Sequence, residues 1–445
     1  MRRQALLALL LIAGCARYTP HPLASAPAVL RPPLAAVLEA KANAIRRPWL
    51  APVTLDLSAP LSPDAVATLA VLNNPDLKAA RIRAGVADAQ VFAAGLLPDP
   101  TVSLGASQVL SGPDPFVDIA SSLALDINAL RTRGVTRARA EAEARQVRLD
   151  LAWQEWQTAG QARIQAVRIL ALDQISALAR QSADASQWLY DQTQAAARRG
   201  DLSGDRLQAA RVAALDASSK LRTAEQDLAT ARNELSNLLG LPPGTVPRLA
   251  EMPLPQSPPT TEVLFALARS NRTDLQALRA GYAVEEAAVH KAVLDQFPTL
   301  GLTINGNRDS AGNTLVGPAV SFTLPLWNRN RGGIAVERAT RAALKAEYEA
   351  RLFQTRAEIG AAEDGIALAF RQRADAEQGL QQIRRFAEAS LRAAAQGDVS
   401  QETALAAEQA LRDRLTQIAQ SEQAIREQMI ALELLTGTPR EAWES

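Results

Sequence analysis

Cys15 is the only cysteine among the 445 residues of the chain. It follows a basic start at Arg2 and Arg3 and a short apolar run from Ala5 to Ile12, which is the pattern of a secretion signal. This run is too short to span a bilayer permanently. A single cysteine also has no partner for an internal disulfide in an oxidising compartment. Residues 1–14 are therefore predicted to be a signal peptide.

The residues Ile12-Ala13-Gly14-Cys15 resemble the lipobox of bacterial lipoproteins. The resemblance implies cleavage before Cys15 and a covalent lipid on its thiol. In lipoproteins an aspartate directly after the cysteine tends to hold the protein at the inner membrane. The residue here is Ala16, which implies the outer membrane of a Gram-negative cell. The alternative is an ordinary signal with an incidental thiol.

Other residues that could do chemistry are too sparse for a catalytic or metal centre. His21 and His290 are too few and too far apart for a zinc site, and three methionines cannot form a soft-metal relay. No histidine is paired with a serine or cysteine, and no glycine-rich phosphate loop is present. A net charge of +1 gives no electrostatic reason to expect nucleic acid. We therefore expect neither an enzyme nor a cofactor.

The sequence repeats itself after about 198 residues. Matching positions include Asn73, Asp76 and Leu77 with Asn271, Asp274 and Leu275; Pro100 with Pro298; and Gly200-Asp201 with Gly397-Asp398. Such a register predicts two copies of one supersecondary unit, repeat 1 at residues 62–240 and repeat 2 at 260–438. Proline-rich segments predict an extended tether at 15–61 and a linker at 241–259. Residues 439–445 form a tail.

A strand hairpin is expected in each repeat, at residues 100–127 and 298–326, because apolar side chains alternate there with polar or small ones. Each strand has roughly the ten residues that a tilted strand needs to cross a bilayer. The alternation would place Asp118, Asp126, Thr303 and Asn305 towards a wet lumen and the apolar face towards lipid. A half-exposed soluble sheet would show the same alternation. The flanking aromatic residues Phe116, Phe297 and Trp327 favour the membrane.

A long helical hairpin is expected after each strand hairpin, at residues 134–239 and 333–436. Only Gly160 interrupts the proline-free stretch from Gly134 to Arg199, a helix of roughly 100 Å. The returning segment carries two apolar rows with a seven-residue period, which is typical of a coiled-coil seam. These rows are Leu207, Ala214, Leu221, Leu228 and Leu235, and Ala210, Ala217, Ala224, Ala231 and Leu238.

Four strands cannot close a barrel, and an open sheet edge cannot face lipid because its backbone groups would lack partners. Several chains must therefore combine their strands. Two chains would give eight strands, which side chains fill, whereas three would give twelve, wide enough for a passage. The helices would continue this tube on one side of the membrane.

These motifs, in this order and spacing, resemble the TolC-like outer membrane factors of tripartite efflux pumps and type I secretion systems. The resemblance covers residues 62–438 and includes the segment from Pro325 to Ile334. It implies a mainly α fold with a transmembrane β-barrel: a homotrimeric, 12-stranded barrel continuing into a long α-helical periplasmic tube. It also implies a passive outer membrane efflux channel that works with a periplasmic adaptor and an inner membrane transporter. The stretch Trp327–Gly333 is most similar to the heavy-metal (cobalt–zinc–cadmium) branch, which implies an RND-type transporter.

Three alternatives remain open. The channel could serve type I protein secretion rather than efflux of metal ions or drugs. A periplasmic coiled-coil adaptor lipoprotein should instead have one helical hairpin flanked by lipoyl-like β segments. A lipid-anchored envelope enzyme would need the catalytic constellation that the sequence lacks.

The two Gly-Asp turns would form the periplasmic tip of the tube, where the resemblance implies a gate and the contact with the adaptor. The residues concerned are Gly200, Asp201, Leu202, Ser203, Asp205, Gly397, Asp398, Val399, Ser400 and Glu402. Some relatives have an acidic constriction one to two helical turns further on, but the residues at these positions are Arg206, Ala209, Thr403 and Ala406. The turn carboxylates could form a different acidic ring that favours cations. The alternative is that these segments are only stable, solvated turns.

Arginines gather where each strand hairpin passes into its long helix. They are Arg131, Arg133, Arg137 and Arg139, and Arg329, Arg331, Arg338 and Arg341. They could bind lipid headgroups at the inner edge of the membrane or form plain solvated helix faces.

Overall fold

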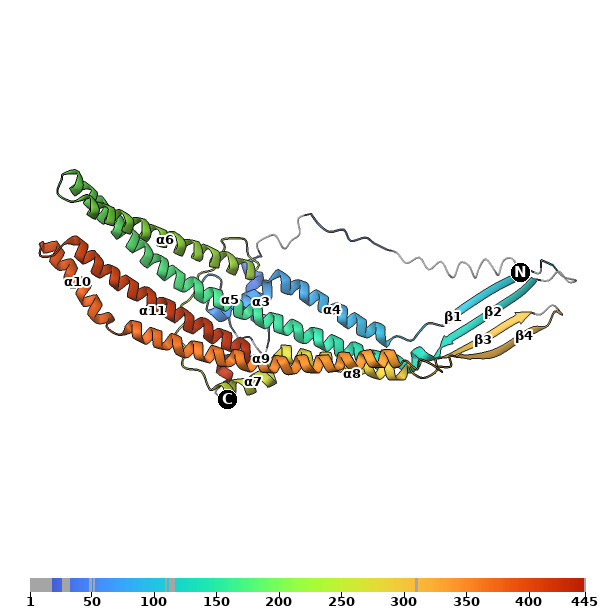
Figure 1. The fold of residues 1–445 in the computed structure, drawn as a ribbon. Helices are drawn as coiled ribbons and strands as arrows, with labels where there is room; N and C mark the ends of the chain where they lie inside the picture. Colours follow the sequence, from blue (N-terminus) through green and yellow to red (C-terminus); the bar gives the residue numbers. More distant parts are fainter. Residues whose placement is uncertain are drawn as a thin grey trace.

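The computed structural model describes residues 18–25, 33–47, 50, 53–108, 110–111, 117–308 and 311–443. The signal peptide, Cys15 and Phe116 lie outside these residues. The described chain is elongated, with a four-stranded sheet at one end and two helix-to-helix turns at the other; long helices run between the two ends, and short helices pack beside them midway (Figure 1). No helix among the described residues combines the length and the apolar character needed to cross a bilayer.

Repeat 1 begins with a capped helix. The Ser62 hydroxyl accepts a hydrogen bond from the backbone N–H of Ala65 at 3.2 Å, and Pro63 occupies the first turn. The elements of repeat 1 are α3 (Pro63–Asn73), α4 (Pro75–Gly95), β1 (Thr101–Gln108), β2 (Val117–Asp126), α5 (Ile127–Arg198) and α6 (Gly204–Leu238).

Repeat 2 has the same order of elements, with one additional break. They are α7 (Thr261–Asn271), α8 (Thr273–Leu294), β3 (Leu300–Arg308), β4 (Thr314–Phe322), α9 (Arg331–Glu377), α10 (Leu380–Gln396) and α11 (Gln401–Thr436). A short 3-10 helix, η2 (Arg440–Ala442), follows α11, and Trp443 packs into the core around α7, α9 and α11. The expected tail is therefore partly folded onto repeat 2.

Several boundaries differ from those expected. The first long helix begins at Ile127 instead of residue 134, because Asp126 at the end of β2 caps it through the N–H of Ala129 at 2.9 Å. The expected extended tether contains a helix, α2 (Ala35–Ala44), whose Leu38 and Ala42 are buried in the core around α3. Strand β4 ends at Phe322, before the last residues of the expected hairpin.

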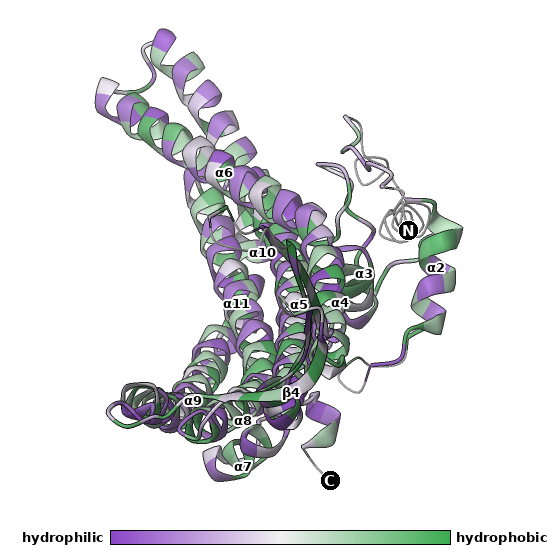
Figure 2. Ribbon diagram, turned by 90° about the vertical axis from the view of Figure 1, so that its right-hand side faces the viewer, coloured by the Kyte–Doolittle hydropathy of each residue, from purple (hydrophilic) through white to green (hydrophobic). Residues whose placement is uncertain are grey.

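The sheet has the order β1-β2-β3-β4 with antiparallel neighbours. The pairing of β2 with β3 joins the two repeats, while β1 and β4 form the edges of the sheet. In Figure 2 the ribbon at β4 is mostly hydrophobic, whereas α6, α9 and α11 alternate between hydrophilic and hydrophobic residues.

The long helices pack through small residues. In α6 the buried residues Ala214, Ala217, Ala224, Leu228, Ala231 and Leu235 belong to the two predicted rows. Helix α5 also packs against α11 of repeat 2. A Cβ atom at Gly160 of α5 would lie only 2.5 Å from the side chain of Leu434, so the missing side chain permits this close approach. Gly160 does not interrupt the helix, because α5 is continuous from Ile127 to Arg198.

Candidate functional site

The strand register gives the sheet two unlike faces. Residues paired across an antiparallel ladder project to the same side, and Ser122 pairs with Asn305 and Ala124 with Thr303. The four residues predicted to share a face, Asp118, Asp126, Thr303 and Asn305, therefore lie on one side of the sheet. Their neighbours on that face are mostly small or polar: Thr101, Ser103, Ser107, Ala120, Gly301, Asn307, Gly317, Ala319 and Ser321.

The opposite face of the sheet is mainly apolar. It carries Val102, Leu104, Val117, Ile119, Leu123, Leu125, Leu300, Leu302, Ile304, Val316, Pro318, Val320 and Phe322. Several of these large side chains are exposed, including Leu104 at 81 % and Val320 at 62 %. A contiguous exposed apolar face of this size marks a surface that binds lipid or protein.

The polar face carries charge of one sign only. Among the described strand residues on this face, Asp118 and Asp126 are the only ionisable ones. Asp126 has a second role, because its carboxylate is the cap of α5.

Each lateral flank of the chain belongs to one repeat. Helix α5 packs against α8 and α11 of repeat 2, which places these helices inside the chain. Strand β1 and helices α4 and α6 lie on the flank formed by repeat 1; β4, α9 and α10 lie on the flank formed by repeat 2. Both flanks expose large apolar side chains: Ile82, Val86 and Phe92 on α4, Val212 and Leu215 on α6, Val336 and Phe353 on α9, and Phe386 on α10.

The two Gly-Asp turns have the same backbone geometry. Gly200 and Gly397 both have a φ of +84°. In turn 1, the N–H groups of Gly200 and Asp201 bond to the carbonyls of Ala197 and Ala196 at 3.0 Å. In turn 2, the corresponding bonds to Ala394 and Ala393 measure 3.1 and 2.9 Å. Glycine is needed at both positions because the turn is left-handed there.

The side chains of the two turns differ. In turn 1, Asp201 forms an ion pair with Arg199 at 2.9 Å, and a hydrogen bond from Ser203 lowers the pKa of Asp205. In turn 2, Ser400 caps α11 through the N–H of Thr403 at 3.1 Å.

Asp398 and Glu402 in turn 2 form no ion pair within the described part of the chain. Turn 2 is thus the more negatively charged of the two, and the copies differ where the sequence places the tip.

A buried ion pair joins the two repeats midway along the chain. Arg163 of α5 contacts Glu433 of α11 at 2.5 Å and Asp64 of α3 at 3.2 Å, and Glu433 is only 1 % exposed. Burial raises the pKa of Glu433, although the charge of Arg163 opposes this shift. This contact has no signal in the sequence.

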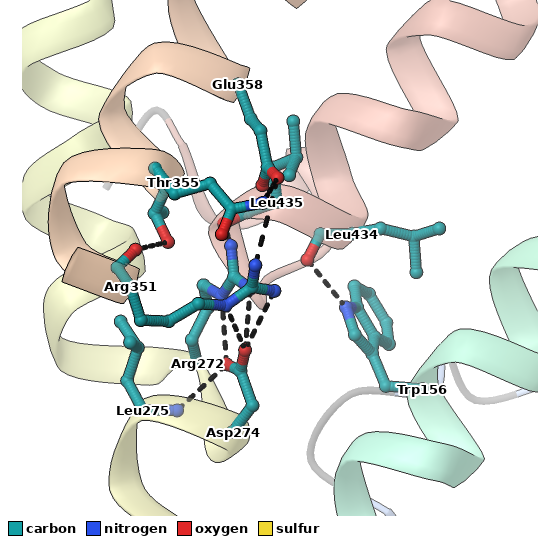
Figure 3. A network of polar contacts seen from close by, with 10 residues as sticks. Trp156, Arg272, Asp274, Leu275, Arg351, Thr355, Glu358, Leu434 and Leu435 are labelled. Atoms are coloured by element: carbon teal, nitrogen blue, oxygen red, sulfur yellow. Dashed lines mark hydrogen bonds and ion pairs between the residues drawn. The ribbon is translucent and has the colours of Figure 1, made fainter. Parts of the chain in front are cut away.

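A second polar network lies at the start of α8 (Figure 3). Arg272 is fully buried and donates to Asp274 at 2.6 Å and to the carbonyl of Leu435 at 3.4 Å. Its guanidinium lies over the Trp153 ring, 4.8 Å from the centroid. Burial alone would raise the pKa of Asp274, but the hydrogen bond and charge of Arg272, with the charge of Arg351, hold it below its usual range.

The segment of the Asn-x-x-Asp-Leu motif attaches each helical start to the end of the returning helix, although through different residues in the two repeats. In repeat 1, the Asn73 amide donates to the carbonyls of Leu239 and Gly240 at 2.7 and 3.0 Å, and Asn74 donates to Leu238 at 3.1 Å. In repeat 2, Arg272 makes the corresponding contact with Leu435. Carbonyl groups at the helix ends are thus satisfied by Asn73 and Asn74 in repeat 1 and by Arg272 in repeat 2, where Asn271 instead donates to Leu267 of its own helix.

Arg131 and Arg133 have a role that the sequence did not indicate. Arg133 donates from Nε to the carbonyl of Gly95 at 2.9 Å, at the end of α4. Arg131 donates to the carbonyl of Leu294, the last residue of α8, at 3.2 Å and to that of Pro298 at 3.4 Å. A positive charge at a helix C-terminus is stabilising, because it lies at the negative end of the helix dipole. These two side chains thus attach the start of α5 to the ends of α4 and α8.

Within the described ranges, no group of three His, Cys, Asp or Glu side chains is arranged to hold a metal ion. The arrangement offers a two-faced sheet, two unpaired flanks and a pair of end turns.

Residues 264–438 match the outer membrane efflux protein family. No curated protein matches the chain.

Several solved structures are similar in fold. The outer membrane channel CmeC of Campylobacter jejuni is 16 % identical, with a TM-score of 0.70, over 84 % of this chain and 85 % of that one. CusC, whose crystal structures describe conformational changes that accompany folding and transmembrane channel formation, is 16 % identical with a TM-score of 0.69, over 85 % of this chain and 92 % of that one. The open state of the MtrE outer membrane channel of Neisseria gonorrhoeae is 17 % identical with a TM-score of 0.62, over 84 % and 88 %.

Proposed function

We propose that this chain belongs to the outer membrane efflux protein family and forms the outer membrane channel of a tripartite efflux system. Such TolC-like channels are trimeric, and their helical tube extends into the periplasm. The observation that carries the proposal is the two-faced sheet with open edges, because neither its apolar face nor its edges are satisfied in one chain.

The closure of the ring follows from the lateral flanks. Each chain places repeat 1 on one flank and repeat 2 on the other, so repeat 2 of one protomer meets repeat 1 of the next. Strand β4 would pair with the neighbour's β1, α9 would pack on its α4, and α10 on its α6. Three protomers would give a barrel of twelve strands with the acidic and small side chains inside.

The finer assignments are also proposals. The channel is passive, and an inner membrane transporter supplies the energy; an RND-type transporter of the heavy-metal branch is favoured by the resemblance of Trp327–Gly333. The Gly-Asp turns contact the periplasmic adaptor and form the gate, and their shared backbone geometry supports a common position at the tip.

Arginine on the apolar face of the sheet should prevent insertion, whereas arginine on the polar face should be tolerated. Ile304 and Asn305 are neighbours in the middle of β3 with opposite orientations. We expect Ile304→Arg to destabilise the inserted barrel by about 2–4 kcal/mol, the cost of arginine facing lipid near the midplane. Asn305→Arg should insert like the unaltered chain. The fraction folded into lipid vesicles, measured by heat-dependent gel mobility, distinguishes the two. Equal losses for both variants would contradict the assignment of the faces.

Lipidation and assembly can be measured together. Native mass spectrometry of protein extracted from membranes with detergent should show a trimer with acyl mass on each protomer. Cys15→Ser should remove the acyl mass, because Cys15 is the chain's only thiol. Acyl mass on the Ser variant would refute the lipid site, and a monomer in the unaltered protein would refute the channel.

A further inference from the structure

Glu285 of α8 is a buried carboxyl group without a counter-charge. Only 8 % of the residue is exposed, and its Oε1 atom has no hydrogen-bond partner in the described part of the chain. Helix α8 packs against both α5 and α9, between the sheet and the middle of the chain (Figure 1). An ionised carboxylate in such a place is costly unless it is paired, so a proton or a cation should stabilise this group.

A second carboxyl group faces Glu285 from α9. The side chains of Glu285 and Glu337 share a hydrogen bond. Two carboxyl groups can form one only when one of them is protonated and donates to the other. Neither residue forms an ion pair among the residues that the structure describes. The two groups therefore form a carboxyl–carboxylate pair across the contact between α8 and α9.

The charges around the pair do not neutralise it. Burial raises the pKa of Glu285, and the hydrogen bond and charge of Glu337 raise it further, whereas the charge of Arg139 in α5 lowers it. Glu286, the next residue of α8, forms its own ion pair with Arg341 of α9 at 3.0 Å, so this arginine is already engaged. Arg139 is thus the one positive charge that acts on Glu285, and it forms no ion pair with Glu285 in the described ranges.

Repeat 1 has no such pair at the matching positions. In the register of the two copies, Glu285 corresponds to Ala87, 198 residues earlier, and Glu337 corresponds to Ala138, 199 residues earlier. Ala87 is buried in α4, and α4 packs on α5 as α8 packs on α9. The contact between these helices therefore forms without carboxyl groups, so packing alone does not explain the pair in repeat 2.

We propose that Glu285 and Glu337 form a proton-binding site that controls how tightly α9 packs on α8. With one proton between them, the two groups make a hydrogen bond across the contact. Without this proton they are two like charges, which repel each other and loosen the contact. The site lies within one chain, so the proposal does not depend on the proposed channel. Helix α9 also lies on the lateral flank of repeat 2, so the proton would affect the surface offered to a neighbouring protomer.

The contact is expected to be strongest in acid. Because the pKa of Glu285 is raised in the folded chain, the folded state binds the proton more tightly than the unfolded state does. This contribution to stability is therefore present at low pH and is lost as the pH rises through the raised pKa. In Glu285→Gln, the amide is neutral and can donate to Glu337 at every pH, so the contact should stay closed.

Hydrogen–deuterium exchange of the detergent-extracted protein tests the site, because exchange reports the local opening of helices. At about pH 8, we expect Glu285→Gln to slow exchange in residues 281–290 of α8 and 333–341 of α9. The slowing should be about two- to fivefold, the effect of removing a like-charge contact. At about pH 5, the variant and the unaltered chain should exchange alike. The matching segments of repeat 1, residues 83–92 and 134–142, should not change and serve as an internal reference.

Two further variants complete the test. Glu286→Gln removes the adjacent, exposed carboxylate, and it should not slow exchange at either pH. Glu337→Gln neutralises the other half of the pair and should act like Glu285→Gln, so the test does not depend on the folding of one variant. Equal exchange in the unaltered chain and both pair variants at about pH 8, or an equal slowing in Glu286→Gln, would overturn the proposal. Slower exchange of the unaltered chain after addition of calcium chloride would also overturn it, because the pair would then bind a metal ion instead of a proton.

Discussion

Replacement of Arg163 by methionine is expected to destabilise the protein by about 3–5 kcal/mol, the usual result of removing one partner of a buried ion pair. The variant would leave the Glu433 carboxylate, which is 1 % exposed, without its counter-charge. It would also remove the ion pairs that join α3 and α5 of repeat 1 to α11 of repeat 2. Urea denaturation of the detergent-solubilised protein, followed by circular dichroism, measures the loss.

Two further variants distinguish the effect of leaving a buried charge unpaired from the effect of removing a charge as such. Arg180→Met removes a charge from the same helix at a site where both partners are largely exposed, and we expect it to cost about 0–1 kcal/mol. Arg163→Met with Glu433→Leu removes both buried charges and should recover most of the stability, because buried ion pairs can be replaced by apolar residues at little cost. A double variant as unstable as Arg163→Met would show that the buried charge is not the cause.

Alanine at Gly240 or Gly437 is expected to have the next largest effect. Both glycines end a returning helix in a left-handed conformation, with φ values of +59° and +72°. A Cβ at Gly240 would lie 2.6 Å from the carbonyl oxygen of Asn73, and one at Gly437 would lie 2.9 Å from the backbone of Arg272. We expect each variant to lose about 1–2 kcal/mol from the backbone conformation and about 1–3 kcal/mol from crowding.

Gly244→Ala is the matched control. Its φ is +78°, but open space surrounds the position of its Cβ. It should therefore show only the conformational part of the loss. Equal melting temperatures for Gly244→Ala and Gly240→Ala would show that the close approach of the motif to the helix end contributes nothing to stability.

The sequence predicted the parts of the fold that depend on local periodicity. Alternation along β2 and β3 was sufficient to place Asp118 and Asn305 on one face, because the register pairs residues of matching parity. The small-residue rows of α6 were likewise correct, since Ala217 and Ala231 are buried. Both patterns follow from the geometry of a single strand or helix, so they need no knowledge of the neighbours.

Features that depend on neighbouring elements could not be predicted. Gly160 and Gly379 look alike in the sequence, yet one lies within an unbroken helix against Leu434 and the other breaks its helix. The roles of Arg131 and Arg133 require the ends of α4 and α8 to lie beside α5, which no local pattern shows. Asp126 was expected only as a strand residue. An aspartate at the end of a strand cannot be told from the sequence apart from one that also caps the following helix.

The buried ion pair has a consequence for the duplication itself. In the register of the two repeats, the counterpart of Glu433 is Ser236 and the counterpart of Arg163 falls on Ala361 or Ala362. A ring built from six identical copies of repeat 1 would therefore place Arg163 against a serine and leave it only the ion pair with the more exposed carboxylate of Asp64. The two halves are no longer interchangeable: their order around the ring is fixed, and neither half on its own can replace the other.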